Sequence, residues 1–127
     1  MYGGFANCDN LKDVLLPKVT ELKGCVFAGC NSLKTFKMPN SLKRLSSKAL
    51  FANCNSLENI DLNNVTYLDI QAFMGCSSLK SVIIPKTVKE VTRGYWDGYE
   101  ITCKFYVYKN SDAQKSIDHY NYMQSTW

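Results

Sequence analysis

Apolar residues recur along most of this chain with a nearly fixed spacing, and the recurrence predicts a stack of similar structural units. In each of four segments a phenylalanine is followed three residues later by a cysteine, and three residues after that by a leucine. These F-x-x-C-x-x-L phrases begin at Phe5, Phe27, Phe51 and Phe73, so the offsets are 22, 24 and 22 residues. Self-similarity at such a period is the sequence signature of a solenoid.

The residues after each leucine alternate between apolar and polar, which predicts a short strand with one buried face. The inward positions are Val14, Phe36, Ile60 and Val82, followed by Leu16, Met38, Leu62 and Ile84. A proline then ends the strand, because it cannot donate to a ladder, and Asn63 takes its place in the third unit. A second apolar pair, such as Val19 and Leu22, completes each unit. We expect tight turns on that side.

A unit of this length cannot bury its apolar residues alone, whereas stacked units can. Equivalent residues then lie above one another at the roughly 4.8 Å spacing of paired strands. We therefore predict an α/β-type repeat solenoid made mostly of strands and turns, with a parallel sheet along one face and columns of like residues inside. Residues 1–94 would form four repeats, the first of them incomplete, and residues 95–127 a C-terminal cap.

The repeat fails after Val91, where aromatic and β-branched residues take over. They predict a closing strand from Ile101 to Tyr108. Ser111 and Gln114 have the spacing of a capping box, which predicts a helix that runs to about Tyr122. The apolar stripe of that helix would consist of Ala113, Ile117 and Tyr120. A strand and a helix together would cover the last repeat, as the terminal units of solenoids must.

The repeated pattern A-F-x-x-C-x-x-L-x-x-V-x-I-P resembles the BspA-like leucine-rich repeats. The resemblance covers residues 5 to 91, and its departures are Asn63 for proline and Val26 or Leu50 for the alanine before phenylalanine. It implies that the L-x-x-V-x-I-P strands line the concave face of a leucine-rich repeat solenoid. It also implies a secreted or surface-attached protein that takes part in adhesion to proteins or host cells. An extracellular or cell-surface location is therefore expected, with the cytoplasm as the alternative.

Composition and charge do not indicate a particular class of binding partner. Fifteen basic and eleven acidic residues give a net charge of +4, and the basic residues are spread along the chain. A nucleic-acid binder concentrates them on one face or in one run, so no nucleic acid is expected. No apolar stretch approaches the roughly 18 residues of a membrane helix, so no membrane insertion is expected either. The first residues lack the basic start and apolar run of a signal peptide.

Four of the six cysteines occupy one repeat position, and we expect them to form a buried column of free thiols. They are Cys8, Cys30, Cys54 and Cys76. Cys25 and Cys103 lie outside the column, and a disulfide bridge that involves either stays open. No pair has C-x-x-C spacing, so neither a metal site nor a cofactor is expected. We predict no catalytic residue; thiol chemistry by Cys103 with the only histidine, His119, is the enzymatic alternative.

The polar positions between the inward residues predict a binding surface on the concave face. They form three columns: Lys12, Lys34, Glu58 and Lys80; Asp13, Thr35, Asn59 and Ser81; and Leu15, Lys37, Asp61 and Ile83. Leu15 and Ile83 are the expected contact anchors, because they are apolar and point outward. An aromatic patch of Tyr95, Trp96 and Tyr99 is a second candidate. The predicted function is a protein-interaction or adhesion module that binds a protein or glycan partner. The alternative is a purely structural terminal segment of a longer array, with no ligand of its own.

The N-terminal unit lacks the half that would precede Phe5, so its apolar side chains are expected to be exposed. Two compatible explanations remain open. The chain is the C-terminal piece of a longer array, or two copies abut through this repeat as a homodimer.

Overall fold

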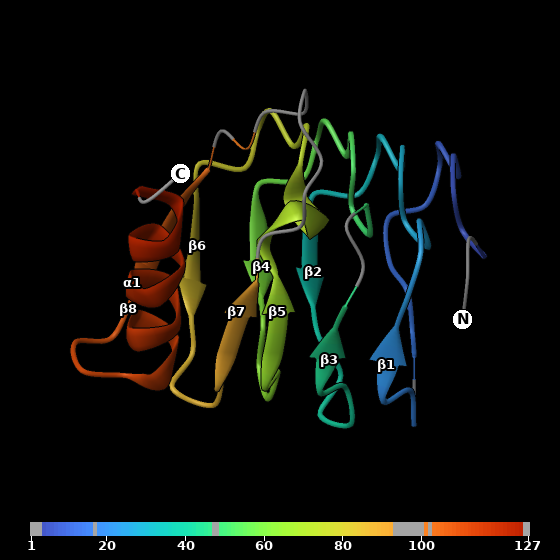
Figure 1. The fold of residues 1–127 in the computed structure, drawn as a ribbon. Helices are drawn as coiled ribbons and strands as arrows, with labels where there is room; N and C mark the ends of the chain where they lie inside the picture. Colours follow the sequence, from blue (N-terminus) through green and yellow to red (C-terminus); the bar gives the residue numbers. More distant parts are fainter. Residues whose placement is uncertain (1–3, 17, 47–48, 93–100, 102, 126–127) are drawn as a thin grey trace.

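The chain forms a solenoid of short strands that ends in one α-helix (Figure 1). The structure is a computed structural model that describes residues 4–16, 18–46, 49–92, 101 and 103–125. The elements in chain order are β1 (Glu21–Leu22), β2 (Thr35–Lys37), β3 (Arg44–Leu45), β4 (Asn59–Asp61), β5 (Tyr67–Asp69), the 3-10 helix η1 (Ile70–Phe73), β6 (Ser81–Ile84), β7 (Glu90–Thr92), β8 (Lys104–Val107) and α1 (Asp112–Ser125). The predicted solenoid of mostly strands and turns is therefore confirmed.

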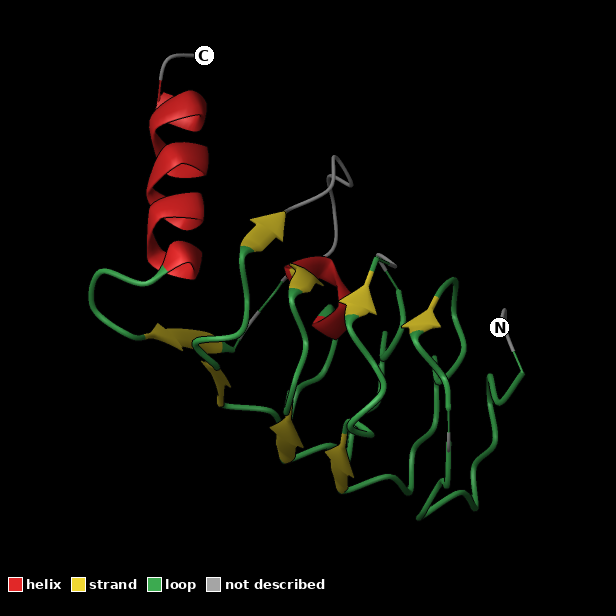
Figure 2. Cartoon of the chain, turned by 90° about the horizontal axis from the view of Figure 1, so that it is seen from below, coloured by secondary structure: helices red, strands yellow, loops and turns green. Residues whose placement is uncertain are grey.

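Strands β2, β4, β6 and β8 follow one another along one side of the solenoid, and we call them the β2–β8 row (Figure 2). β2 pairs in parallel with β4, and β6 pairs in parallel with β8. β4 packs beside β6. In the second, third and fourth units these strands lie where the alternating pattern predicts them. In the first unit, residues 11–16 follow the same path without forming a strand.

Strands β1, β3, β5 and β7 form a second parallel sheet, the β1–β7 row, on the side where the sequence predicts turns. The prediction of turns alone is therefore wrong. Leu22, Leu45, Leu68 and Val91 are aligned in the register of this sheet and point into the core. Each strand has only two or three residues, so a single inward position marks it. A strand this short does not show a repeated alternation of apolar and polar residues, so the sequence does not reveal it.

The core between the two rows consists of columns of identical or similar side chains. Four phenylalanines stack with ring centroids 5.5 Å apart for Phe5 and Phe27, 5.4 Å for Phe27 and Phe51, and 5.9 Å for Phe51 and Phe73. The leucines of the repeated phrase are fully buried in the second, third and fourth units. The predicted inward columns are confirmed.

The cysteine column is held by hydrogen bonds between coils. The Sγ atoms of Cys30, Cys54 and Cys76 each donate to the carbonyl oxygen of a phenylalanine one coil earlier, all at 3.0 Å. All six cysteines are free, so no disulfide involves Cys25 or Cys103. The thiol column is confirmed and is buried at Cys30, Cys54 and Cys76, while Cys8 at its end is half-buried. A thiol is a weak donor, but it is small enough to fit in the core and still give a hydrogen bond to a backbone carbonyl of the preceding coil.

The cap consists of the predicted strand and helix, with different bounds. β8 is shorter than the expected segment from Ile101 to Tyr108, and α1 runs to Ser125 rather than to about Tyr122. Ser111 is the N-cap as predicted, because its Oγ accepts the N–H of Gln114 at 3.1 Å. The Gln114 side chain accepts the N–H of Asn110 at 2.6 Å, one residue before the capping-box position.

Helix α1 covers the end of the β1–β7 row by packing on β7. Ala113 is buried and Ile117 packs against the core as expected, while the side chain of Tyr120 lies outside the described residues. The Ser116 hydroxyl lies 3.0 Å from both the N–H and the carbonyl oxygen of Val91. The helix thus supplies hydrogen bonds to β7 that a further strand would otherwise make.

Candidate functional site

The outward side chains of the β2–β8 row form an exposed surface, which we call the row face. All twelve residues of the three predicted columns are exposed: Lys12, Asp13, Leu15, Lys34, Thr35, Lys37, Glu58, Asn59, Asp61, Lys80, Ser81 and Ile83. The strand register brings neighbouring members of a column side by side, as for Thr35 with Asn59 and for Lys37 with Asp61.

Two of the three columns continue into the cap, beyond the four members predicted for each column. Ser81 is the register partner of Lys104, and Ile83 is the register partner of Tyr106. The repeat phrase is lost after Val91, so a search guided by that phrase stops at Ile83. The alternation of outward Lys104 and Tyr106 with apolar Phe105 and Val107 in the sequence was the signal that could have extended the columns.

Large apolar side chains lie at both ends of the row face. Leu15 is 89% exposed in the first coil. Ile83, Tyr106 and Tyr108 are 63%, 56% and 46% exposed at the C-terminal end. The middle is charged, with Lys37 opposite Asp61. Apolar ends around a charged centre are suited to a partner that lies along the row.

Two shallow hollows lie on this side of the solenoid, one near each apolar end. The first has a volume of about 300 Å³ and is lined by Val14, Leu15, Leu16, Phe36, Lys37, Met38, Pro39 and Asn40. The second has a volume of about 290 Å³ and is lined by Ile60, Asp61, Leu62, Asn63, Ile83, Pro85 and Tyr108. Each contains residues of the predicted columns.

The side chains of the row face make few contacts with one another. Within the described part of the chain, only two of the twelve form side-chain hydrogen bonds. Asp61 accepts the N–H of Asn63 at 2.9 Å, and the Lys80 ammonium donates to the carbonyl of Ser77 at 3.3 Å. The other polar groups are therefore available to a partner.

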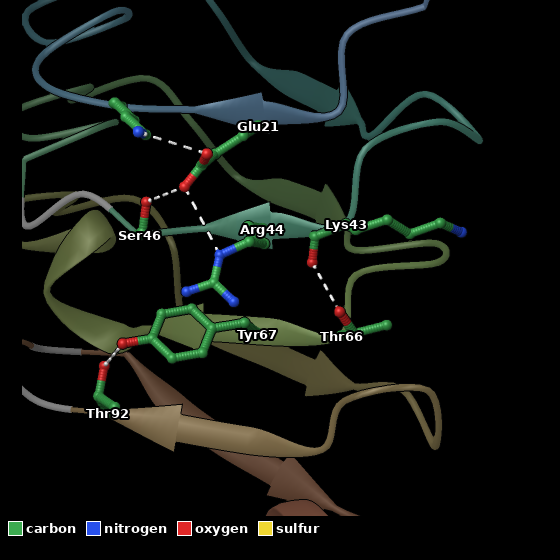
Figure 3. Close-up of polar contacts among 8 residues, drawn as sticks. Glu21, Lys43, Arg44, Ser46, Thr66, Tyr67 and Thr92 are labelled. Atoms are coloured by element: carbon green, nitrogen blue, oxygen red, sulfur yellow. Dashed lines mark hydrogen bonds and ion pairs between the residues drawn. The ribbon is translucent and has the colours of Figure 1, made fainter.

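The outward side chains of the β1–β7 row behave differently, because they bind one another across the strands (Figure 3). The Glu21 carboxylate lies 3.5 Å from both Lys23 and Arg44 and accepts a hydrogen bond from Ser46 at 2.8 Å. The Ser46 hydrogen bond and the two positive charges lower the pKa of Glu21.

The same network continues across β5 and β7. The Arg44 guanidinium lies 4.2 Å from the centroid of the Tyr67 ring, a cation–π contact. The Tyr67 hydroxyl is 3.2 Å from the Thr92 hydroxyl. These residues do not follow from the sequence pattern, since they differ in type from coil to coil and only the strand register brings them together.

The cysteine column does not resemble a reactive thiol site. Burial raises the pKa of Cys54 to about 11 and that of Cys76 to about 12. Burial also raises the pKa of Cys103. A thiol nucleophile needs a lowered pKa, so this shift opposes the enzymatic alternative at Cys103. The side chain of His119 lies outside the described residues.

We expect thiol reactivity to follow this pattern in the native protein. With the pKa values of Cys54 and Cys76 raised, almost no thiolate exists at pH 8, and burial excludes the reagent. Iodoacetamide at pH 8 should therefore modify exposed Cys25 first and leave both buried cysteines unmodified. Peptide mass spectrometry of native and urea-denatured samples measures this. Equal labelling of Cys25 and Cys54 in the native sample would contradict the buried column.

The remaining candidate features are a metal site, a membrane-spanning helix and the aromatic patch. Within the described ranges, no group of three or more histidine, cysteine, aspartate or glutamate residues is placed to hold a metal ion. No helix there is long and apolar enough to cross a membrane. The aromatic patch of Tyr95, Trp96 and Tyr99 lies outside the described residues.

Comparison with known proteins places this geometry among leucine-rich repeats. Residues 2–125 match the BspA type leucine-rich repeat region in six copies. A leucine-rich repeat protein from Bacteroides ovatus ATCC 8483, known from a crystal structure, is similar with a TM-score of 0.50 and 26% sequence identity. The match covers 68% of this chain and 29% of that protein's chain. No curated protein matches this chain.

Proposed function

Because this chain belongs to the BspA-type leucine-rich repeat family, we propose that it is a non-catalytic interaction module that binds a partner protein through the row face. The family suggests protein interaction in general, and its members are typically not enzymes. BspA-type repeats are often surface-associated, which supports a role in adhesion at the cell surface.

The contrast between the two strand rows is the observation that carries this proposal. On the β1–β7 row the polar groups of Glu21, Arg44 and Tyr67 are engaged with their neighbours, so a partner would have to break those contacts. On the row face most polar groups meet only solvent, and apolar anchors lie at both ends. Binding there replaces water without breaking protein contacts, which lowers its cost.

A matched pair of charge-reversal variants tests the choice of face. We expect Lys34→Glu with Lys37→Glu, both on the row face, to weaken partner binding at least about tenfold by reversing charge at the contact. Lys43→Glu with Lys115→Glu makes the same charge change at exposed positions away from that face and should bind like the wild type. Partners captured by the wild type are identified by quantitative mass spectrometry, and their affinities are then measured with purified proteins.

Equal binding by both double variants would exclude the row face as the contact surface. The competing function is a purely structural segment of a longer array, with no ligand of its own. That function predicts no partner whose binding depends on either face. Self-association through the first coil, where Phe5, Leu11 and Val14 are only partly buried, is distinguished by light scattering over a range of concentrations.

A further inference from the structure

The hollow beside Tyr108 combines an aromatic ring, an aliphatic surface and fixed hydrogen-bond acceptors. Tyr108 and Ile83 supply the exposed apolar surfaces, and Asp61 and Asn63 supply the polar groups. Its volume of about 290 Å³ lies at the lower end of the size of small-molecule sites, which suits a ligand of one ring.

The two polar side chains of this hollow are held in place by the solenoid itself. Asn63 donates its side-chain N–H groups to the carbonyl oxygen of Met38 at 2.9 Å and to Oδ1 of Asn40 at 2.7 Å. Its own Oδ1 is therefore left as an acceptor. Asp61 uses Oδ1 to accept the N–H of Asn63, which leaves Oδ2 as a second acceptor. Such pre-organised acceptors need no reordering when a donor arrives.

The charges around the hollow oppose a cationic ligand. Asp61 carries the only negative charge among the lining residues. Lys37 lies opposite Asp61 in the strand register, and the Lys86 ammonium is 5.0 Å from the centroid of the Tyr108 ring. A single carboxylate in the lining, with Lys37 and Lys86 at neighbouring positions, gives little net attraction for a lysine or arginine side chain. A neutral ligand with several hydroxyl groups does not depend on such attraction.

We propose that this hollow binds one neutral hexose unit of a glycan. The apolar C–H face of the sugar packs against Ile83 and the accessible part of the Tyr108 ring, while two hydroxyl groups donate to Asp61 and Asn63. The site goes beyond the proposed protein partner and uses only the C-terminal end of the row face.

Titration of the full chain with methyl β-galactoside, methyl β-glucoside and methyl α-mannoside, followed by NMR of backbone amides, tests the proposal. We expect at least one glycoside to shift the amides of Asp61, Asn63, Ile83 and Tyr108. Tyr108→Ala should weaken that binding about three- to tenfold through loss of ring packing. Asp61→Ala should weaken it by a similar factor, while Tyr67→Ala, which removes a tyrosine from the opposite side, should leave it unchanged.

Absence of shifts at this hollow with all three glycosides would overturn the proposal. Stronger binding of N-acetyl-arginine amide than of any glycoside would overturn it in favour of a site for a cationic side chain. Lys34→Glu alone, which leaves Lys37 opposite Asp61 unchanged, separates this outcome from the proposed protein interaction. It should weaken binding of the partner protein and keep glycoside binding within about twofold, because the Asp61, Asn63, Ile83 and Tyr108 contacts remain.

Discussion

Replacement of Phe51 by alanine should lower the free energy of unfolding by about 3–5 kcal/mol, the range typical of a fully buried phenylalanine. Phe51 is completely buried, and its ring stacks on Phe27 at 5.4 Å and on Phe73 at 5.9 Å. It also meets the edge of Phe36 at 5.2 Å. The substitution therefore opens a cavity between two coils, where neighbouring rings cannot close in without bending the solenoid. Urea denaturation followed by circular dichroism measures the change.

Phe5→Ala is the matched control for this prediction. Phe5 occupies the same repeat position at the end of the column, where it is only partly buried and stacks on Phe27 at 5.5 Å. We expect it to cost about 1–2 kcal/mol, since less apolar area returns to water. Equal losses for the two substitutions would show that position within the column does not matter. The prediction that a phenylalanine between two stacked rings contributes more than one at the end of the column would then be wrong.

The parts of the fold that the sequence predicts are those with a repeated signal of sufficient length. Phe, Cys and Leu recur at nearly constant offsets, and the alternation after each leucine extends over several residues. Together these predict β2, β4, β6 and the buried columns. The β1–β7 row was missed because strands such as β1 have two residues, which is too short for a period of two to be visible.

Some residues of the candidate site likewise follow from the sequence, and others depend on the strand register. The twelve column residues follow from the alternation, whereas Tyr106 and Tyr108 belong to the cap and join the row face only through the pairing of β6 with β8. The contact between Arg44 and Tyr67 depends on the register of β3 with β5, and no local pattern carries that information. The N-cap at Ser111 could be predicted because it depends on residues three apart.

Asn63 shows how one apparent departure from the repeat fits the local backbone. The chain takes four residues to pass from Met38 to the inward Leu42, but three to pass from Leu62 to Val65, as from Leu16 to Val19 in the first unit, which keeps Pro17. In the first unit the left-handed residue of this shorter turn is Lys18, with φ of 67°, whereas in the third unit it is Asn63 itself, with φ of 48°. Asparagine tolerates this conformation, and proline, with φ fixed near −65°, cannot adopt it.

Restoring the repeat with Asn63→Pro should therefore destabilise the protein by about 3 kcal/mol or more. The proline would force a new turn and remove the N–H that Asp61 accepts at 2.9 Å. It would also remove the side-chain bonds to Met38 and Asn40 in the preceding coil. Urea denaturation of the variant and the wild type measures the loss.

Asn63→Gly separates the two causes of that loss. Glycine adopts the left-handed backbone and keeps the N–H, so only the side-chain bonds to the preceding coil disappear. We expect a cost of about 1–2 kcal/mol for these bonds, clearly less than for proline. If the proline variant were as stable as the glycine variant, the short turn would not depend on a left-handed residue. The third unit would then accept the same proline as its neighbours, and the asparagine would be held only by its contacts with Met38 and Asn40.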